Sequence, residues 1–202
     1  WVIRAAGKDL IVTGGRPRGT LYAVYHLLED VLGVHWWNPW EETVPAAPTL
    51  NLQLTELRGK PVTPYRDIYM LYGNDGGHFA ARNRLNRDGD VPITAEYGGT
   101  MDYGPPYHVH TFYSYIPPET YFADHPEWFS LIGGKRQAEG GQLCLTNPEL
   151  RRVFLEKLRA YIETSAAEAQ KAGKPAPLVF SVSQNDWSGA CECEACQAIA
   201  KA

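Results

Sequence analysis

The segment Leu178–Cys196 restricts the fold more than any other part of the chain, because its character changes abruptly halfway along. Its first part, Leu178–Val182, is apolar and β-branched, and it follows a long helical pattern and a proline-bounded break at 174–177. This order is typical of a buried parallel strand in an α/β fold. The polar residues Ser183–Asp186 come next, and the loops after the carboxyl ends of parallel strands are where such folds bind ligands.

Asp186 is therefore the leading candidate for a catalytic residue, and its neighbours Asn185 and Trp187 are candidates for substrate binding. A purely structural role is the alternative, because Asn and Asp favour turns and the positions that cap helices. Asn185 and Asp186 are expected at the carboxyl end of a parallel strand, beside Asn147.

Strand and helix patterns alternate from Tyr65 onward. The predicted strands are Tyr65–Tyr72, Val109–Tyr113, Gln142–Leu145 and Leu178–Val182, with helical segments at Phe79–Arg87, Pro117–Trp128 and after Asn147. Such alternation predicts a parallel sheet with right-handed crossovers.

The helix after Asn147 has the clearest boundaries. Asn147 is a good N-cap, Pro148 suits the first helical position, and Gly173 ends the pattern. Its spacing predicts a buried face that consists of Leu150, Phe154, Leu158, Tyr161 and Ile162.

The first 57 residues predict a small α+β domain. Trp1–Arg4 and Leu10–Thr13 form a hairpin, and Val34–Trp37 and Leu50–Leu54 are further strands. A helix begins at Thr20 and ends at Gly33. Its expected buried face comprises Leu21, Val24, Leu28 and Val31.

The run GGRPRGTLYAVYHLLEDVLGVHWWNPWEETVP, from Gly14 to Pro45, resembles the non-catalytic N-terminal domain of family-20 β-hexosaminidases and family-67 α-glucuronidases. In those enzymes this domain supports a catalytic barrel. The resemblance therefore implies that Trp36 and Trp37 are packing residues first, with contact to sugar as the alternative.

The runs HTFYSYIPPETYFADHPEWFSLIGGKR, QLCLTNPEL and SVSQNDWSGACECEAC resemble a bacterial family of uncharacterised, glycoside-hydrolase-like barrel domains. This resemblance implies an α/β fold in which residues 1–57 form the α+β domain. Residues 58–202 would then form the first half, about four βα units, of a TIM-type (β/α)8 barrel. It also implies an exported, carbohydrate-active protein, and the two ends of the chain suggest a piece of a longer one.

The order of elements is also similar to that of family-20 enzymes, in which an Asp-Glu pair ends the fourth strand. Asn185 and Asp186 stand at that place. The departure puts N-acetylhexosaminidase activity in doubt, because Asn cannot supply the carboxylate that stabilises an oxazolinium-like intermediate. Acid catalysis by Asp186 remains compatible with the pattern.

These features predict a glycoside hydrolase of the α-glucuronidase or hexosaminidase type, with no cofactor required for catalysis. Glycoside hydrolysis uses two carboxyl groups, and the partner of Asp186 is expected in a later strand. Further candidates for substrate binding are His110, Asn147 and Asn74, each with a structural alternative. The alternative function is a carbohydrate-binding or scaffold protein that keeps the barrel without catalysis.

The cysteines suggest a second site. Cys191, Cys193 and Cys196 form a C-x-C-x2-C motif, and Cys144 lies on a strand predicted to neighbour theirs. Four close thiolates suit tetrahedral zinc, whereas an exported protein would favour disulfides. A structural role, as zinc ligands or as one or two bridges, is favoured over catalysis or redox activity.

The composition of the chain limits the classes of partner that it can bind. A net charge of −4 and a pI near 5.9 provide no basic field for nucleic acid. No apolar run has the length of a membrane span. The six Trp, twelve Tyr and six Phe offer faces for sugar rings, with filling of the core as the alternative. No feature of the sequence indicates an oligomeric state.

Overall fold

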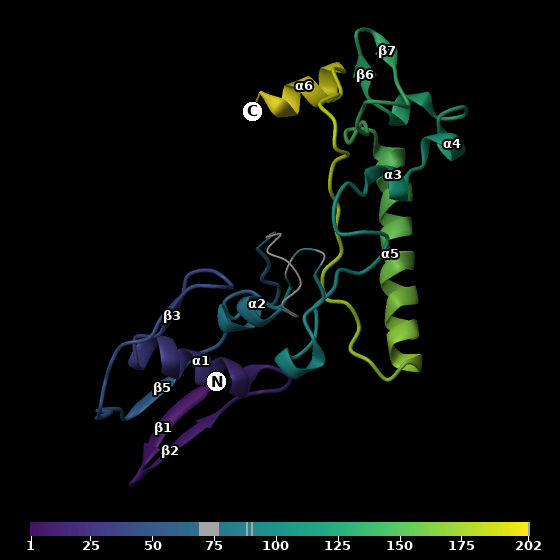
Figure 1. Ribbon diagram of the computed structural model, residues 1–202. Coiled ribbons are helices and arrows are strands. Elements are labelled where there is room, and N and C mark those ends of the chain that lie inside the picture. Colours follow the sequence, from purple (N-terminus) through teal and green to yellow (C-terminus); the bar gives the residue numbers. More distant parts are fainter. Residues whose placement is uncertain (69–76, 88, 90, 202) are drawn as a thin grey trace. The chain divides into compact units, whose positions relative to one another are not determined.

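The computed structural model describes all residues except 69–76, 88, 90 and 202. The chain divides into two compact units, Trp1–Met101 and Asp102–Ala202. The predicted domain boundary after residue 57 falls inside the first unit. The division into a non-catalytic domain, residues 1–57, and part of a catalytic barrel, residues 58–202, stays a prediction. Figure 1 shows the course of the chain through both units.

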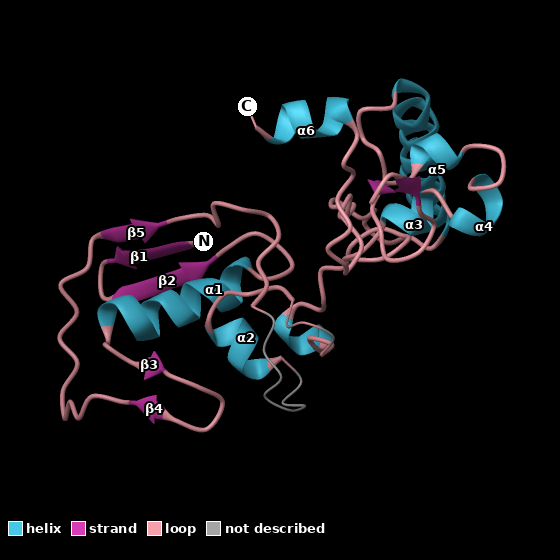
Figure 2. Ribbon diagram, turned by 90° about the horizontal axis from the view of Figure 1, so that it is seen from above, coloured by secondary structure: helices cyan, strands magenta, loops and turns pink. Residues whose placement is uncertain are grey.

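The first unit contains a three-stranded antiparallel sheet of β1 (Val2–Ala6), β2 (Asp9–Thr13) and β5 (Glu56–Arg58) in the order β2-β1-β5. The predicted hairpin is confirmed. Figure 2 shows α1 along one face of this sheet.

The strand predicted at Leu50–Leu54 is wrong, because those residues are irregular and β5 begins at Glu56. The strand forms at Glu56–Arg58 and not at Leu50–Leu54 because Glu56–Arg58 pairs with β1. Leu57 lies opposite Ile3, and Ile3 is completely buried.

The helical segment of this unit is α1 (Gly19–His26), continued by a π-helical turn, η1 (Leu27–Val31). Its buried face consists of Tyr22, Ala23 and Tyr25, so the predicted face is wrong at Val24, which is exposed. The large aromatic rings select this face, because they pack in one cluster that also contains Val34, Trp36, Phe79 and Ala81.

A short antiparallel pair, β3 (His35–Trp36) and β4 (Glu42–Thr43), presents the two adjacent tryptophans differently. Trp36 is buried, which confirms its packing role. Trp37 is 64% exposed, and its indole Nε1 donates a hydrogen bond to Thr43 Oγ1 at 2.9 Å.

The rest of the first unit is largely irregular. The helix predicted at Phe79–Arg87 is only the short α2 (His78–Arg82), followed by a positive φ of 58° at Arg84. A 3-10 turn, η2, covers Ala95–Tyr97. Half of the predicted strand Tyr65–Tyr72, residues 69–72, lies outside the described residues.

The second unit is organised around one long helix, α5 (Pro148–Lys171). Asn147 caps it as predicted: its Oδ1 accepts hydrogen bonds from the backbone N–H groups of Glu149 and Leu150, both at 3.0 Å. Leu150 and Phe154 are buried, whereas Ile162 is 41% exposed, so the predicted buried face is wrong at Ile162. The core around α5 comprises Phe112, Tyr115, Ile116, Trp128, Phe129, Leu143, Leu150 and Phe154.

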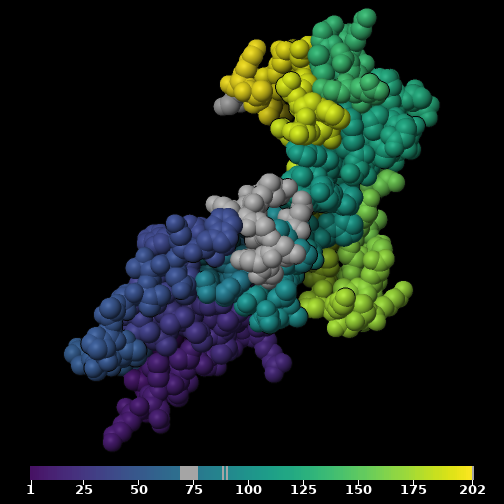
Figure 3. Space-filling view, viewed as in Figure 1, coloured from purple at the N-terminus to yellow at the C-terminus, as the bar shows by residue number. Residues whose placement is uncertain are grey.

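Short elements surround α5. They are α3 (Phe112–Tyr115), α4 (Pro118–Tyr121), η3 (Pro126–Trp128), the hairpin of β6 (Leu131–Ile132) and β7 (Lys135–Arg136), and α6 (Glu194–Ala200). The helical segment predicted at Pro117–Trp128 is confirmed as α4 and η3. In Figure 3 the yellow C-terminal segment lies against the green and teal part of this unit, in agreement with the Glu192 N–H to Leu131 O hydrogen bond of 2.8 Å.

The strands predicted at Val109–Tyr113, Gln142–Leu145 and Leu178–Val182 are wrong as regular strands. α3 begins inside the first, and the second has one isolated bridge, between Leu143 and Phe129. In the third, Leu178 and Val182 are 71% and 52% exposed, so the apolar run is not buried. The described residues form a mixed α+β structure, and a partial barrel is not confirmed.

The reason lies in the partners of the 179–185 backbone. Its carbonyls and N–H groups bond to irregular positions and side chains, such as the Thr111 hydroxyl, instead of to a ladder of neighbouring strands. None of the described helices is both long and apolar enough to cross a membrane.

Candidate functional site

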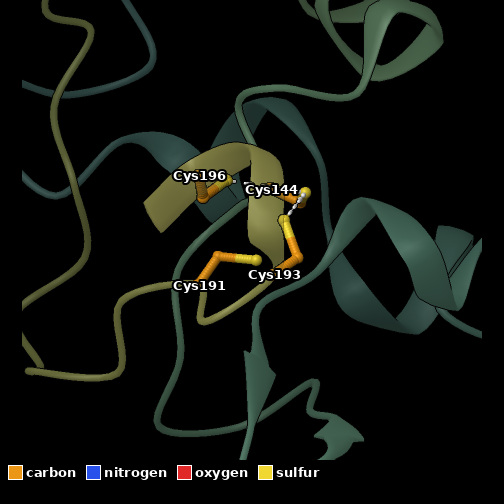
Figure 4. A group of neighbouring side chains, drawn as sticks. All are labelled: Cys144, Cys191, Cys193 and Cys196. Atoms are coloured by element: carbon orange, nitrogen blue, oxygen red, sulfur yellow. Dashed lines mark hydrogen bonds between the residues drawn. The ribbon is translucent and has the colours of Figure 1, made fainter. Parts of the chain in front are cut away.

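Four cysteine sulfurs converge in the second unit (Figure 4). The Sγ atoms of Cys144, Cys191, Cys193 and Cys196 all lie within 4.8 Å of one another. Cys144 Sγ is 3.6 Å from Cys193 Sγ and 3.8 Å from Cys196 Sγ, and all four cysteines are free. The prediction that the four cysteines lie close together is confirmed.

Three parts of the unit bring these sulfurs together. Cys144 is buried, lies three residues before the cap of α5, and donates its backbone N–H to Trp128 O at 2.8 Å. Cys193 is the N-cap residue of α6, and Cys196 lies in the first turn of that helix, so both sulfurs face the same side. Cys191 contacts β6, where the backbone N–H of Leu131 donates to its Sγ at 3.4 Å.

The thiols differ in acidity. The backbone N–H of Cys196 bonds to the Cys193 sulfur and lowers the pKa of that thiol to about 6. Burial raises the pKa of Cys191 to about 12, and burial also raises the pKa of Cys196. Of these three thiols, Cys193 is therefore the one that ionises most easily.

Polar groups border the cluster. Thr146 Oγ1 lies 3.2 Å from Cys196 Sγ and 3.5 Å from Cys144 Sγ. The Nη1 of Arg136, on β7, donates to Cys191 Sγ at 3.6 Å. Burial acts to lower the pKa of Arg136, but a hydrogen bond to Cys144 and the charges of the cluster cysteines outweigh it, so this pKa is raised.

The sulfur positions fit a tetrahedral metal. Zinc–sulfur bonds of about 2.3 Å in a tetrahedron place the sulfurs about 3.8 Å apart. The separations of 3.6 Å and 3.8 Å from Cys144 Sγ match this edge, whereas a disulfide needs sulfurs at about 2.05 Å. Four thiolates are soft ligands that select zinc over magnesium or calcium.

The loop that carries the catalytic candidate lies a few residues before the cluster, and buried amides fix it. Asn185 is 4% exposed; its Nδ2 donates to Gly141 O at 3.1 Å and its Oδ1 accepts from Tyr113 N at 3.3 Å. Gln142 closes the contact: its Oε1 accepts from Asn185 N at 2.8 Å, and its Nε2 donates to the Asn185 and Trp187 carbonyls. Asn185 therefore holds the backbone of the loop.

The next side chains of the loop face solvent. Asp186 is exposed and Trp187 is 49% exposed. His110 joins them from a distant part of the sequence, because its Nδ1 lies 3.1 Å from Gln184 O. The backbone of His110 has a φ of 53°, a conformation that is uncommon for residues other than glycine and is often found at functional sites. The structure thus brings His110 to the loop of Asn185, Asp186 and Trp187.

The other candidates are placed differently. Asn147 uses its Oδ1 to cap α5, and contact with substrate stays a prediction for it. Asn74 lies outside the described residues. The expected place of Asn185 and Asp186 at the end of a regular strand is wrong, since no strand precedes them.

Two residues that support these sites are missed by the sequence reasoning. Gln142 is visible as a polar residue at the start of the apolar run Gln142–Leu145, and such a residue needs a partner when it is buried. Arg136 gives no signal, because only the hairpin of β6 and β7 turns it toward the cysteines.

A family model described as "Domain of unknown function (DUF4838)" matches residues 36–202. No curated protein and no solved structure matches the chain.

Proposed function

This chain belongs to the DUF4838 family, and we propose from its own residues that it is part of a glycoside hydrolase in which Asp186 is the general acid. The observation that carries this proposal is the meeting of His110 with the loop of Asp186 and Trp187 through the 3.1 Å contact to Gln184 O. A proton donor, an aromatic face and a hydrogen-bonding imidazole at one exposed place suit the binding of a sugar and the protonation of its leaving oxygen, and the second carboxyl group of the reaction is expected in a later strand.

Each residue has a distinct role in this proposal. Asp186 donates a proton to the leaving oxygen, the ring of Trp187 stacks on a sugar, and His110 hydrogen-bonds a hydroxyl. Asn185 positions the loop of Asp186 and Trp187 through its buried amide and does not itself contact the substrate. Rigid backbone support of this kind is what a catalytic group needs to be held in place.

The experiment is Asp186→Asn in the intact protein, assayed on natural glycosides and on aryl glycosides with an acidic phenol. Loss of general acid catalysis lowers the rate by about 10²- to 10⁴-fold. The penalty should be much smaller on the aryl substrates, because their leaving group needs little protonation. Asp124→Asn, at another exposed aspartate of the same unit, is the matched control and should leave both rates unchanged.

Equal penalties on both substrate classes would exclude Asp186 as the acid. A wild-type protein that hydrolyses no glycoside but loses sugar binding on Trp187→Ala would support the alternative, a non-catalytic carbohydrate-binding protein. The exposed Trp187 ring favours this second function specifically, since stacking on a sugar needs no catalysis.

We also propose that the four cysteines bind one structural zinc ion. The supporting observation is that all four sulfurs lie within 4.8 Å of one another and that the two separations from Cys144 Sγ, 3.6 Å and 3.8 Å, agree with the edge of a ZnS₄ tetrahedron. Bound zinc would join the start of α5, β6 and α6, and would so fix the segment that follows Asp186. The chemistry of such an ion is structural, because four protein ligands leave no open position.

Metal analysis of the purified protein tests this proposal, with one zinc per chain and four unmodified thiols after chelation as the expected result. Mass spectrometry without reductant identifies the alternative, since each disulfide removes two hydrogen atoms. Thr146→Val is the control: it removes a hydroxyl that borders the cluster, keeps all four sulfurs and should still bind one zinc per chain.

A further inference from the structure

Arg136 occupies a defined position between the core and the cysteine cluster. Its Nη1 donates to Phe129 O at 2.7 Å and to Cys191 Sγ at 3.6 Å. Phe129 is completely buried, so the carbonyl that anchors the guanidinium belongs to the rigid core of the unit. The same guanidinium nitrogen thus contacts both a core carbonyl and a sulfur of the cluster.

A metal-bound cluster of four cysteines would carry net negative charge, and the position of Arg136 places a positive charge beside it. Four thiolates around one divalent ion carry two net negative charges, and the cluster is one buried and three half-buried residues. Burial of uncompensated charge is costly, and a nearby cation reduces the cost. The guanidinium is permanently charged, in contrast to the neutral donors Thr146 Oγ1 and Leu131 N–H.

We infer that Arg136 is a positioning residue of the metal centre, whose charge and hydrogen bond to Cys191 stabilise the metal-bound tetrathiolate. This inference rests on the proposed zinc site and goes beyond its four ligands. Groups that hydrogen-bond metal ligands orient those ligands and tune their donor strength, and their loss lowers metal affinity about 10- to 100-fold.

The experiment compares Arg136→Met and Arg136→Lys with the wild type in the intact protein. Zinc affinity is measured by competition with a chromophoric chelator, and cobalt(II) reports the geometry and the sulfur-to-metal charge-transfer band. Arg136→Met should weaken zinc binding about 10- to 100-fold. Its charge-transfer band should move to lower energy, because a thiolate without its cationic donor gives up an electron more easily.

Arg136→Lys keeps the charge but places it on a compact ammonium with a flexible stem instead of the rigid guanidinium, so its zinc affinity should lie between those of the wild type and Arg136→Met. It also provides a folded variant if Arg136→Met does not fold. Arg152→Met is the matched control: it removes the same charge from the exposed surface of α5, where Arg152 pairs with Glu149 and Glu156. It should change neither the affinity nor the band.

The outcomes separate the two proposals. A wild-type chain that binds neither zinc nor tetrahedral cobalt overturns the metal centre, and the role of Arg136 with it. A wild type that binds zinc while both Arg136 variants bind it equally well, with an unshifted band, overturns the role of Arg136 alone.

Discussion

The two units differ in how the backbone N–H and C=O groups of their extended segments find hydrogen-bond partners. In the first unit, β1 pairs with β2 and β5 through regular antiparallel ladders. In the second, the extended segments at 104–111, 141–143 and 179–189 have almost no ladder, and their backbone groups bond to one another singly or to side chains. Thr111, Gln142 and Asn185 supply those side-chain bonds from buried positions.

This difference indicates which substitutions should destabilise each unit most. A ladder spreads its stability over many equivalent hydrogen bonds and leaves side chains free to pack. A set of buried side-chain bonds concentrates stability in a few groups, because each lost partner leaves a buried polar atom unpaired. The cysteine cluster and the loop of Asp186 both lie in the unit of the second kind.

The largest effect should come from removing the metal. Structural zinc contributes about 10–16 kcal/mol to the folding of small zinc-finger peptides. Chelation should therefore strongly accelerate amide hydrogen exchange around Cys144 and α6, while β1 and β2 keep their protection. Hydrogen exchange with and without chelator measures this, and the first unit is the internal control. Equal loss of protection in both units would break the distinction between them.

A cavity made in the first unit should instead destabilise the first unit. Ile3→Ala removes a completely buried side chain at the centre of the sheet, which should cost about 2–5 kcal/mol in the free energy of unfolding. Denaturant unfolding of the zinc-loaded protein measures this loss. Ile11→Ala is the matched control on β2, because Ile11 is 46% exposed and its truncation should cost much less. Similar losses for both variants would contradict the packing described for this sheet.

The buried amide of the second unit should have an intermediate effect. Asn185→Ala leaves Gly141 O and Tyr113 N without their side-chain partner, at an expected cost of about 1–3 kcal/mol. The neighbouring exposed residue provides the control, and Gln184→Ala should be nearly neutral. Equal unfolding free energies for Asn185→Ala and the wild type would show that the loop does not depend on this amide.

The smallest effect concerns the cap of α5. Asn147→Ala should destabilise the protein by about 1 kcal/mol, because it removes the acceptor of two helical N–H groups. Asn147→Ser keeps a capping oxygen and should recover most of that loss. Urea unfolding with both variants measures the difference, and an unchanged Asn147→Ala protein would contradict the cap.

The sequence by itself determined the elements whose signals are local. The hairpin of β1 and β2 follows from a turn between two apolar runs, and the boundaries of α5 follow from Asn147, Pro148 and Gly173. The meeting of four cysteines was also predictable, since three share a short motif and Cys144 lies in a segment expected beside theirs. These patterns act over a few residues, or repeat a chemistry that has few structural solutions.

Tertiary structure alone decided the rest. Leu178–Val182 has the composition of a buried strand, yet a strand also needs neighbours in register. The Ser181 carbonyl accepts hydrogen bonds from the Thr111 and Tyr115 hydroxyls instead. Contact between His110 and the loop of Asp186 joins positions 74 residues apart, which no local pattern encodes. Arg136 becomes a partner of Cys191 only because a hairpin turns it there. Such contacts depend on the relative positions of whole segments, and those positions are fixed by packing rather than by the preferences of single residues.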